Sequence, residues 1–584
     1  MMDSHIDPIE LELFKHAVFT IADEMAVTVI RTSYSSVVRD NMDFSTAITD
    51  RHGQVVAQGL TIAGHLGSIP SALAAVTARY GDALKPSDVF LLNDPYSGGM
   101  HLPDIFIFMP IFDGDQLIAF AAAVCHHTDV GGRVAGSNAA DSTEIYQEGL
   151  RIPPLRLYEG NRINETLEAL IERNVRLPDN VMGDLRAQVA ACRVAERNVL
   201  SLCNDMGSDK VMLFMNETMD YAERMTRQAI SKLPDGVFEF EDWIDDDGVV
   251  PGRPIRLHVA FTKKDDSLSA DWTGSAPQVK GAINSTLSYT SAATYCAVRS
   301  ILEGDIPDND GMCRAIEVVA PPGSIVNVLP PGACAARGLT GFRMLDCAFG
   351  ALARMVPEKV FAASDGGVTG ISFGGYREDR SPFVYVEFLS AAWGGRPEAD
   401  GPDGISNLLS NLSLPSAEGI EAHHPVEVVC CEFVRDTAGA GRFRGGCSLR
   451  RQLRFLEKEG TLQMRADRQT FPPYGLSGGH AGTFSRNTIT SGETIRVLPG
   501  KVTVPIYQDD IITHETAGAG GWGEPLERDP EAVLRDVRDD LFSTPFARNV
   551  FGVVIDRDRW MVDVDATKTR RKEIFAAKEL NGID

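Results

Sequence analysis

Two long apolar runs stand out in the hydrophobic pattern of the chain. They cover residues 104–112 and 116–125, and the turn-forming sequence Asp113-Gly114-Asp115 separates them. Two apolar runs of strand length around a glycine-containing turn predict a β-hairpin. A turn centred near Gly114 places the start of the first strand beside the end of the second strand. Residues at these two ends of the pattern are therefore expected to lie close together.

The start of the chain carries the pattern of an amphipathic helix. Asp7 is suited to the N-cap, Pro8 to the first helical position, and Glu10 stands three residues after the cap. The apolar residues that follow recur at helical spacing and form one stripe: Leu11, Phe14, Val18, Ile21, Met25 and Val29. We interpret this stripe as a surface packed against the core rather than a cofactor-binding surface.

The rest of the first region, up to about residue 232, mixes strands and helices. In chain order, the pattern predicts strands at 44–49 and 54–58 around a turn at 50–53, a helix at 71–79, a strand at 89–92, the hairpin above, and a mostly helical segment at 164–232 with breaks near Pro178 and Gly207. A second hairpin and several helices are therefore expected to surround the long hairpin.

From Gly236 onward, short alternating segments bounded by Gly, Pro and Asp predict strands. These segments are 238–243, 255–261, 268–272, 317–329, 383–389, 427–434 and 448–455, with one helix predicted at 288–302. The last residues return to a helical pattern, in which Asp529 caps 531–541. We therefore expect an α+β, multi-domain protein with an N-terminal α/β domain at 1–232, a β-rich domain at 233–525 and a short helical C-terminal segment at 526–584.

Composition narrows the class of protein. The 584 residues are 43% hydrophobic and 23% charged, as in an ordinary globular protein. Lys and Arg number 56 against 81 Asp and Glu, and the formal charge of −25 argues against nucleic acid or an anionic membrane as a partner. The ten cysteines include no CxxC pair, no signal peptide opens the chain, and no run of 18 apolar residues occurs. A cytoplasmic location without a membrane span is expected.

The ends of the predicted hairpin carry the candidate chemistry. His101 and Asp104 stand at the start of the first strand, and His126 and His127 at the end of the second. Opposed Cβ atoms in antiparallel strands lie about 5 Å apart, so two imidazoles and a carboxylate can converge. Such a set with open coordination positions suits zinc or manganese. Successive strand residues face opposite sides, so both His126 and His127 are not expected to bind one metal, and spacing does not choose between them. Polar strand ends without a ligand are the competing interpretation.

Other motifs are weaker indications of a site. Residues 518–523 fit G-x-G-x-x-G, but Glu524-Pro525 follow at once, so a tight turn or a loop lining the site is favoured over a nucleotide site. Residues 475–479 match G-x-S-x-G in letters, but Pro472-Pro473 precede them, so a loop is favoured over a nucleophile elbow. No P-loop sequence G-x-x-x-x-G-K-[ST] occurs.

Two further groups of polar residues leave alternatives open. His423-His424 precede Pro425, and either a second site or a surface loop is consistent with that sequence. Arg465 and Arg468 could bind an anion, and structural salt bridges explain them equally well.

Several segments together resemble one known family. They are NDPYSGGMHLPD at 93–104, CHHTDVGG at 125–132, MDFS at 42–45, IPDNDG at 306–311, YGLSGG at 474–479 and ETAGAGGWGEP at 515–525. In this order, and over nearly the whole length, they resemble the hydantoinase B/oxoprolinase family. That family includes the B-type subunits of ATP-dependent hydantoinases and lactamases, 5-oxoprolinase, and the acetone and acetophenone carboxylases.

The resemblance implies a metal site and its ligands. In relatives, the positions matching His101, Asp104 and His126 hold a divalent metal, and the position matching Asp43 is a further ligand. The resemblance therefore favours His126 over His127. It also adds Asp43, which local spacing could not identify. His127 or Asp129 would then hydrogen-bond to a metal ligand and orient it, or act as a general base.

The resemblance also implies a division of labour between two subunits. A partner A-type subunit binds ATP and phosphorylates the carbonyl oxygen of the substrate, and the B-type subunit completes the reaction at its zinc or manganese ion. The expected function is thus that of the metal-dependent B subunit of an ATP-dependent cyclic amide hydrolase, acting on a hydantoin, lactam or oxoproline-like ring. The alternatives are a subunit of an acetophenone- or acetone-type carboxylase, whose acetone carboxylase members are longer, and a non-catalytic scaffold.

Overall fold

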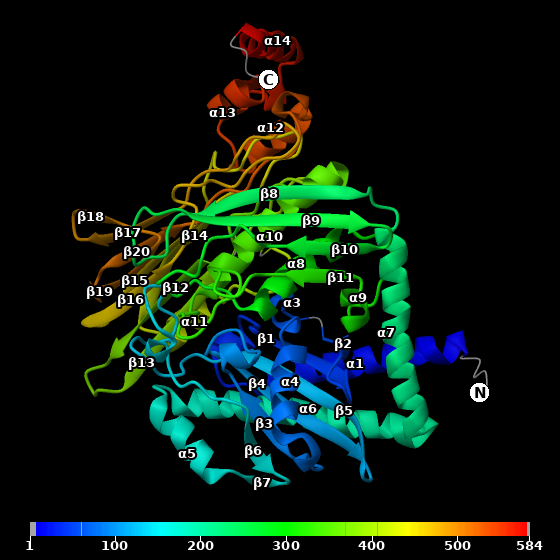
Figure 1. The fold of residues 1–584 in the computed structure, drawn as a ribbon. Helices are drawn as coiled ribbons and strands as arrows, with labels where there is room; N and C mark the ends of the chain where they lie inside the picture. Colours follow the sequence, from blue (N-terminus) through cyan, green and yellow to red (C-terminus); the bar gives the residue numbers. More distant parts are fainter. Residues whose placement is uncertain (1–6, 60, 368, 390, 406, 581–584) are drawn as a thin grey trace.

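The computed structural model describes residues 7–59, 61–367, 369–389, 391–405 and 407–580. Four larger sheets, of seven, four, four and five strands, carry helices between and around them, and a two-stranded ribbon lies near the C-terminus. Figure 1 shows the N-terminal sheet in blue, the central green strands with their helices, the yellow and orange strands to one side, and the red C-terminal helices projecting beyond them. The protein therefore has a mixed α+β, multi-sheet architecture, as predicted.

The seven-stranded sheet contains the predicted long hairpin. Its order is β2 (Val55–Gln58), β1 (Phe44–Asp50), β5 (Gln116–His126), β4 (Asp104–Asp113), β3 (Val89–Leu92), β6 (Leu155–Glu159) and β7 (Arg162–Ile163). β4 and β5 pair antiparallel, with Asp113 opposite Gln116 at the turn and Asp104 opposite His126 at the far end. The hairpin and the proximity of its two ends are confirmed.

The pairing of this sheet corrects one part of the predicted fold class. Each neighbouring pair of strands in the seven-stranded sheet runs antiparallel. Hairpins connect β1 to β2 and β4 to β5, whereas alternating α/β folds connect parallel strands through helices. The first region is therefore α+β rather than α/β.

Both faces of β4 and β5 are covered, which explains their continuous apolar sequence. Phe106 and Phe108 belong to one buried cluster, and Ile105 and Ile107 belong to a second cluster on the opposite face. The second face is covered by α6, which also packs against α1. The helices of this region are α1 (Pro8–Thr32), α2 (Ser36–Arg39), α3 (Ala63–Leu66), α4 (Ile69–Tyr80), α5 (Glu165–Asn174), α6 (Pro178–Met206) and α7 (Ser208–Ile230).

The opening helix α1 forms as its sequence predicts. The Asp7 side chain accepts a hydrogen bond from the Ile9 N–H at the N-cap, and Pro8 occupies the first turn. Phe14, Val18 and Val29 are buried along one face. The stripe is therefore core surface.

A four-stranded sheet follows and supports two central helices. Its order is β11 (Ile316–Val319), β10 (Ser267–Asp271), β9 (Ile255–Lys264) and β8 (Gly236–Ile244), and the helices of this part are α8 (Leu287–Ile301), α9 (Asp310–Cys313) and α10 (Arg337–Met355). α10 packs against β8, β9 and α8. The predicted strand over 317–329 is wrong beyond Val319, because the chain turns through Pro321 and through Gly323 at φ +79°.

Two further antiparallel sheets share a buried cluster. One sheet orders as β13 (Pro382–Leu389), β12 (Thr369–Tyr376), β16 (Glu459–Arg465) and β19 (Lys501–Tyr507). The other orders as β14 (Val426–Phe433), β15 (Leu449–Phe455), β20 (Ile511–Glu515), β17 (Arg486–Ser491) and β18 (Thr494–Leu498). Phe373 of the first sheet packs edge-on against Phe455 of the second within this cluster.

The C-terminal segment is helical, as predicted. It contains α12 (Pro530–Arg538), α13 (Thr544–Val550), β21 (Ile555–Asp556), β22 (Met561–Val562) and α14 (Val564–Leu580). Asp529 caps α12 through its side chain. The predicted boundary at residue 232 falls between α7 and β8, and the division into three domains stays a prediction. Among the helices of the described residues, none combines the length and the hydropathy needed to cross a membrane.

Candidate metal centre

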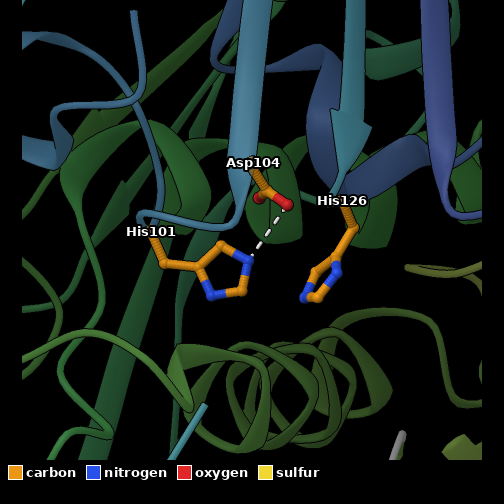
Figure 2. A group of neighbouring side chains, drawn as sticks. All are labelled: His101, Asp104 and His126. Atoms are coloured by element: carbon orange, nitrogen blue, oxygen red, sulfur yellow. Dashed lines mark hydrogen bonds and ion pairs between the residues drawn. The ribbon is translucent and has the colours of Figure 1, made fainter. Parts of the chain in front are cut away.

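Three buried side chains meet where the two long strands begin and end. His101 lies in the loop before β4, Asp104 begins β4, and His126 ends β5. One nitrogen or oxygen atom from each lies within 4.8 Å of the others. Figure 2 shows the two imidazole rings and the carboxylate pointing toward one another, with a hydrogen bond of 3.0 Å between His101 Nε2 and Asp104 Oδ1. The structure thus brings together three of the four predicted metal ligands in one cluster.

Strand parity and loop anchoring place these side chains. Asp104 pairs directly with His126, so both point to the same face of the sheet. The preceding loop is held by Asn93, whose side-chain amide donates to the carbonyl oxygens of Leu102 at 2.7 Å and Leu150 at 2.9 Å. The ring Nδ1 of His101 lies 2.8 Å from the carbonyl oxygen of Ala335, which fixes the orientation of the ring. Both the strands and the loop are therefore constrained before any ligand binds.

Asp43, the fourth predicted ligand, lines the same cavity. It directly precedes β1, and its carbonyl oxygen accepts from the N–H of His126 at 3.0 Å. Burial, followed by the charge of Asp104, raises the pKa of Asp43 well above its usual value. Burial also acts on Asp104, but His101 and Arg337 outweigh it and hold its pKa well below the usual range. Two carboxylates so close in a buried cavity favour a cation between them.

His65 joins this centre from α3 and was not predicted. Its Nε2 lies 3.6 Å from Asp43 Oδ1 and 3.9 Å from Asp104 Oδ2, while its Nδ1 lies 3.2 Å from the hydroxyl of Ser45. Burial lowers its pKa to about 4, so the ring is neutral at pH 7. No spacing rule connects one histidine in TIAGHLGS with the long hairpin, so the sequence held no signal for it.

The His126 ring is prepared for a ligand. Neither of its ring nitrogens has a hydrogen-bond partner among the described residues. Its ring packs against His101 at 5.1 Å and against Phe388 at 5.3 Å between centroids. Burial, followed by His101, holds its pKa well below the usual value, so the imidazole is neutral. A neutral buried imidazole without a partner, beside two carboxylates, fits a divalent metal site.

Two arginines complete the cavity, which has a volume of about 70 Å³. Arg337, at the first position of α10, places Nη2 2.5 Å from Asp104 Oδ2 and lies over the ring of Tyr289. Arg465, at the end of β16, reaches the cavity from the third sheet. The ionisable residues that line the cavity are Asp43, His65, His101, Asp104, His126, Tyr289, Arg337 and Arg465. The site is therefore assembled from elements far apart in sequence.

The other predicted site residues, His127 and Asp129, lie outside the lining of this cavity. His127 faces α6, where its Nε2 lies 3.1 Å from Gln188 Oε1. The carboxylate of Asp129 accepts from the N–H groups of Gly131 and Gly136 and pairs with Arg176 at 2.8 Å. Both side chains therefore contact other parts of the protein and not the cavity. Such contacts are what a residue that positions the metal-site loop would make.

The glycine-rich motifs form closely packed loops. A Cβ at Gly521 would lie 2.2 Å from the carbonyl oxygen of Ala440, and a Cβ at Gly520 would lie 2.0 Å from that of Tyr474. Ser477 lies in a turn at φ +51°, and its neighbour Leu476 bridges to Trp522, so the serine does not stand between a strand and a helix. His423 ends a short helix, α11 (Ala417–His423), rather than lying in a loop. The preference for structural turns at both glycine motifs is thus confirmed.

Known proteins resemble this chain over nearly its whole length. Residues 7–525 match the family described as Hydantoinase B/oxoprolinase. The caprolactamase of Pseudomonas jessenii is similar in sequence and in structure. Its beta subunit is 30% identical over 586 residues, covering 97% of this chain and 99% of the subunit. The crystal structure of that ATP-dependent caprolactamase matches with a TM-score of 0.90 at 28% identity, covering 97% of this chain and 100% of the matched chain.

Two other relatives mark the breadth of the similarity. The 5-oxoprolinase of Dictyostelium discoideum is 30% identical over 530 residues, covering 89% of this chain but 41% of the oxoprolinase. An acetone carboxylase in its nucleotide-free structure has the same fold, with a TM-score of 0.91 at 18% identity, covering 98% of this chain and 84% of the carboxylase chain. The family match and the fold agree, and the chain belongs to the hydantoinase B/oxoprolinase family.

Proposed function

We propose that this chain is the metal-dependent subunit of an ATP-dependent cyclic amide hydrolase. The observation that supports it most is the buried cluster of His101, Asp104 and His126, with Asp43 beside it. The imidazoles are neutral, and the two carboxylates supply charge for a divalent cation such as zinc or manganese. A metal bound by these four residues would supply Lewis acidity and a water of lowered pKa.

The residues of the cluster and around it would balance the charge of the cation, orient the ligands and exclude water. Asp43 and Asp104 offset the charge of the cation, and His101 is held in one orientation by the Ala335 carbonyl oxygen. Phe388 packs against His126 and excludes water from that side of the ring. Ring opening requires a water oxygen on the carbonyl carbon, cleavage of the carbon–nitrogen bond and a proton on the ring nitrogen. Release of phosphate consumes a second water.

The comparisons support a partner that handles ATP. A relative that this chain matches over 99% of its length is named as the beta subunit of caprolactamase, and a matching crystal structure is that of an ATP-dependent caprolactamase. The 5-oxoprolinase is more than twice as long as the part that this chain matches, because that part is 41% of it. We propose that an A-type subunit supplies the missing half and phosphorylates the carbonyl oxygen of the substrate.

His127 and Asp129 are proposed as positioning residues. Gln188 donates from Nε2 to the carbonyl oxygens of Ile105 at 2.8 Å and Ala123 at 3.1 Å, and its Oε1 accepts from His127. This network fixes the strand ends that carry the metal ligands. A general-base role for either residue stays a prediction.

The carboxylase is the second candidate, favoured by the likeness of fold to acetone carboxylase. At 18% identity this likeness concerns the fold alone, so labelled bicarbonate is the means of separating the two reactions. A scaffold without catalysis is the third candidate, and the buried cluster of His101, Asp104 and His126 with Asp43 in the same cavity argues against it.

One experiment tests the proposed function by separating the two half-reactions. In the complex of both subunits, His126→Ala should leave assembly and substrate-dependent ADP formation in place, while ring opening falls by about two or more orders of magnitude. Lys458→Ala, on an exposed side chain, is the control and should behave as wild type. ¹³C-bicarbonate is included, and label in the product would select the carboxylase. Normal ring opening by a metal-free, assembled His126→Ala complex would refute a role of the metal.

A further inference from the structure

We infer that Arg465 and the N-terminus of α10 form an oxyanion site beside the metal centre, and that this site holds the phosphoryl group of the activated substrate. The inference rests on the proposed function, because the phosphoryl group comes from the ATP-dependent step. It gives a role to Arg465, which is neither a proposed metal ligand nor part of a salt bridge among the described residues.

Arg465 is a buried cation without a counterion. Its side chain is 3% exposed, and it forms no ion pair with a carboxylate in the part of the chain that the structure describes. Its Nη1 donates to the carbonyl oxygen of Asn138 at 3.2 Å and to the hydroxyl of Ser372 at 2.9 Å, while Nη2 finds no partner among the residues that the structure describes. A buried charge left unpaired is costly, so an anion is expected from outside the chain.

The neighbouring Arg468 shows what a structural arginine looks like in this protein. It is also buried, but its Nη2 lies 2.5 Å from Asp346 Oδ2 and its Nη1 lies 3.5 Å from Asp242 Oδ2. The two arginines stand three positions apart, and the fold supplies carboxylates to one of them. The sequence left open whether these arginines bind an anion or form salt bridges. Arg468 forms salt bridges, whereas Arg465 is free to bind an anion.

The fold makes room for the Arg465 guanidinium. A Cβ at Gly370, the position opposite Arg465 across β12 and β16, would lie 2.1 Å from its Nη2. The guanidinium lies over the ring of Phe388 at 5.5 Å, and the same ring packs against His126. The Phe388 ring thus lies between Arg465 and the proposed metal ligand His126, and Arg465 lines the same cavity.

The N-terminus of α10 faces this cavity as well. Ala336, Arg337 and Gly338 line it, and no side chain forms a capping hydrogen bond at this end of the helix. A Cβ at Gly338 would meet no atom within 4 Å, so this first turn borders open space. The N–H groups of Arg337 and Leu339 already donate to the carbonyl oxygens of Cys334 and Ala336, so this end of the helix attracts an anion mainly through its dipole.

Charge favours a phosphoryl group over a singly charged anion. The cavity is lined by two carboxylates, of Asp43 and Asp104, and by two guanidinium groups, of Arg337 and Arg465, so their formal charges balance. A divalent cation then leaves two positive charges in excess, which a phosphoryl dianion neutralises. A carboxylate, carried by an oxoproline-like substrate, would neutralise one of them.

The test measures binding of inorganic phosphate and of acetate to the full metal-loaded chain by calorimetry. Arg465→Met should weaken phosphate binding by about tenfold or more at unchanged metal content, and Arg465→Lys should weaken it less. Arg454→Met, on the neighbouring sheet and paired with Glu427, is the matched control and should bind as wild type. Equal phosphate affinity of wild type and both Arg465 variants would overturn the site, and so would acetate binding as tightly as phosphate.

A second measurement in the two-subunit complex separates this inference from the proposed function. Arg465→Met should raise the amount of phosphate released per ring opened above the wild-type ratio, because a poorly held phosphorylated substrate escapes to water. If the ratio is unchanged, Arg465 does not hold the phosphoryl group, even if ring opening by the wild-type complex supports the proposed hydrolase function. Absence of ring opening in the wild-type complex would refute the function, while the phosphate-binding comparison would still be decisive for the site.

Discussion

His126 and His127 are neighbours in sequence with opposite surroundings. His126 ends β5 facing the cavity, and its ring nitrogens lack partners among the described residues. His127 lies on the other side, where Gln188 Oε1 accepts a hydrogen bond. Because Gln188 uses its amide group to donate to two backbone carbonyl oxygens, the proton in this bond belongs to His127 Nε2. Strand parity thus separates the proposed metal ligand from the proposed positioning residue.

This difference predicts opposite effects of two alanine substitutions. His127→Ala should keep the metal content of wild type and lower the free energy of unfolding by about 1–3 kcal/mol, because a buried hydrogen bond is lost. His126→Ala should lose the metal and, in metal-free protein, change the free energy of unfolding less. Elemental analysis and denaturant unfolding measure the two quantities. Metal loss in His127→Ala with retention in His126→Ala would reverse the assignment.

The sequence could predict the part of the site that lies within one hairpin. His101, Asp104 and the pair His126-His127 follow from the position of one turn. Arg337 could not be predicted, because it contacts Asp104 across 233 residues of sequence. His65 likewise depends on how α3 packs beside β1, which no local pattern determines.

Among the helices and strands, prediction succeeded where apolar residues recur at a regular spacing and only one face of the element is buried. β3 covers Val89–Leu92, as predicted, and α1 buries its predicted stripe. α10 was not predicted, because nearly all its residues from Arg337 to Leu352 are buried and no polar face marks its period. Its N-terminus at Ala336 also lacks a capping side chain, which removed the usual start signal. The missed helix is the one that carries Arg337.

His514 of β20 links the third and fourth sheets and gives a prediction for pH dependence. Its Nδ1 lies 2.5 Å from Asn487 Oδ1 on β17, and its Nε2 lies 2.6 Å from the hydroxyl of Thr369 on β12. Burial lowers its pKa to about 4 from 6.5. Above pH 6.5 the ring is neutral in both the folded and unfolded states. Between pH 6.5 and 4 the unfolded state takes up the proton first, so stability falls by up to about 3 kcal/mol as the pH falls.

Replacing the titrating ring tests this linkage. In His514→Gln, the free energy of unfolding should depend less steeply on pH between 6.5 and 4 than in wild type, whatever the loss of stability at pH 7. Denaturant unfolding at several pH values gives both slopes. His16→Gln, on an exposed surface of α1, is the control, and its slope should match wild type. Equal slopes for wild type and His514→Gln would show that His514 does not contribute.

The whole molecule brings the site together from three sheets. The seven-stranded sheet and its loops carry the proposed metal ligands, α10 packed on the second sheet supplies Arg337, and the third sheet supplies Arg465 and Phe388. Local patterns predict most of these strands but carry no information on how one sheet packs against another.

The organisation of the family predicts that this chain does not act alone. The full sequence contains no G-x-x-x-x-G-K-[ST], and its G-x-G-x-x-G glycines pack against the backbone of neighbouring loops. The isolated metal-loaded chain should therefore show no ATP binding by calorimetry and no ring opening with ATP. Mixing with an A-type subunit should give a stable hetero-oligomer by light scattering and restore ATP-dependent ring opening. A mixture containing His126→Ala controls for activity of the partner alone. Tight ATP binding or ATP-dependent turnover by the isolated chain would refute the division of labour, because one subunit would then hold both the nucleotide and the metal.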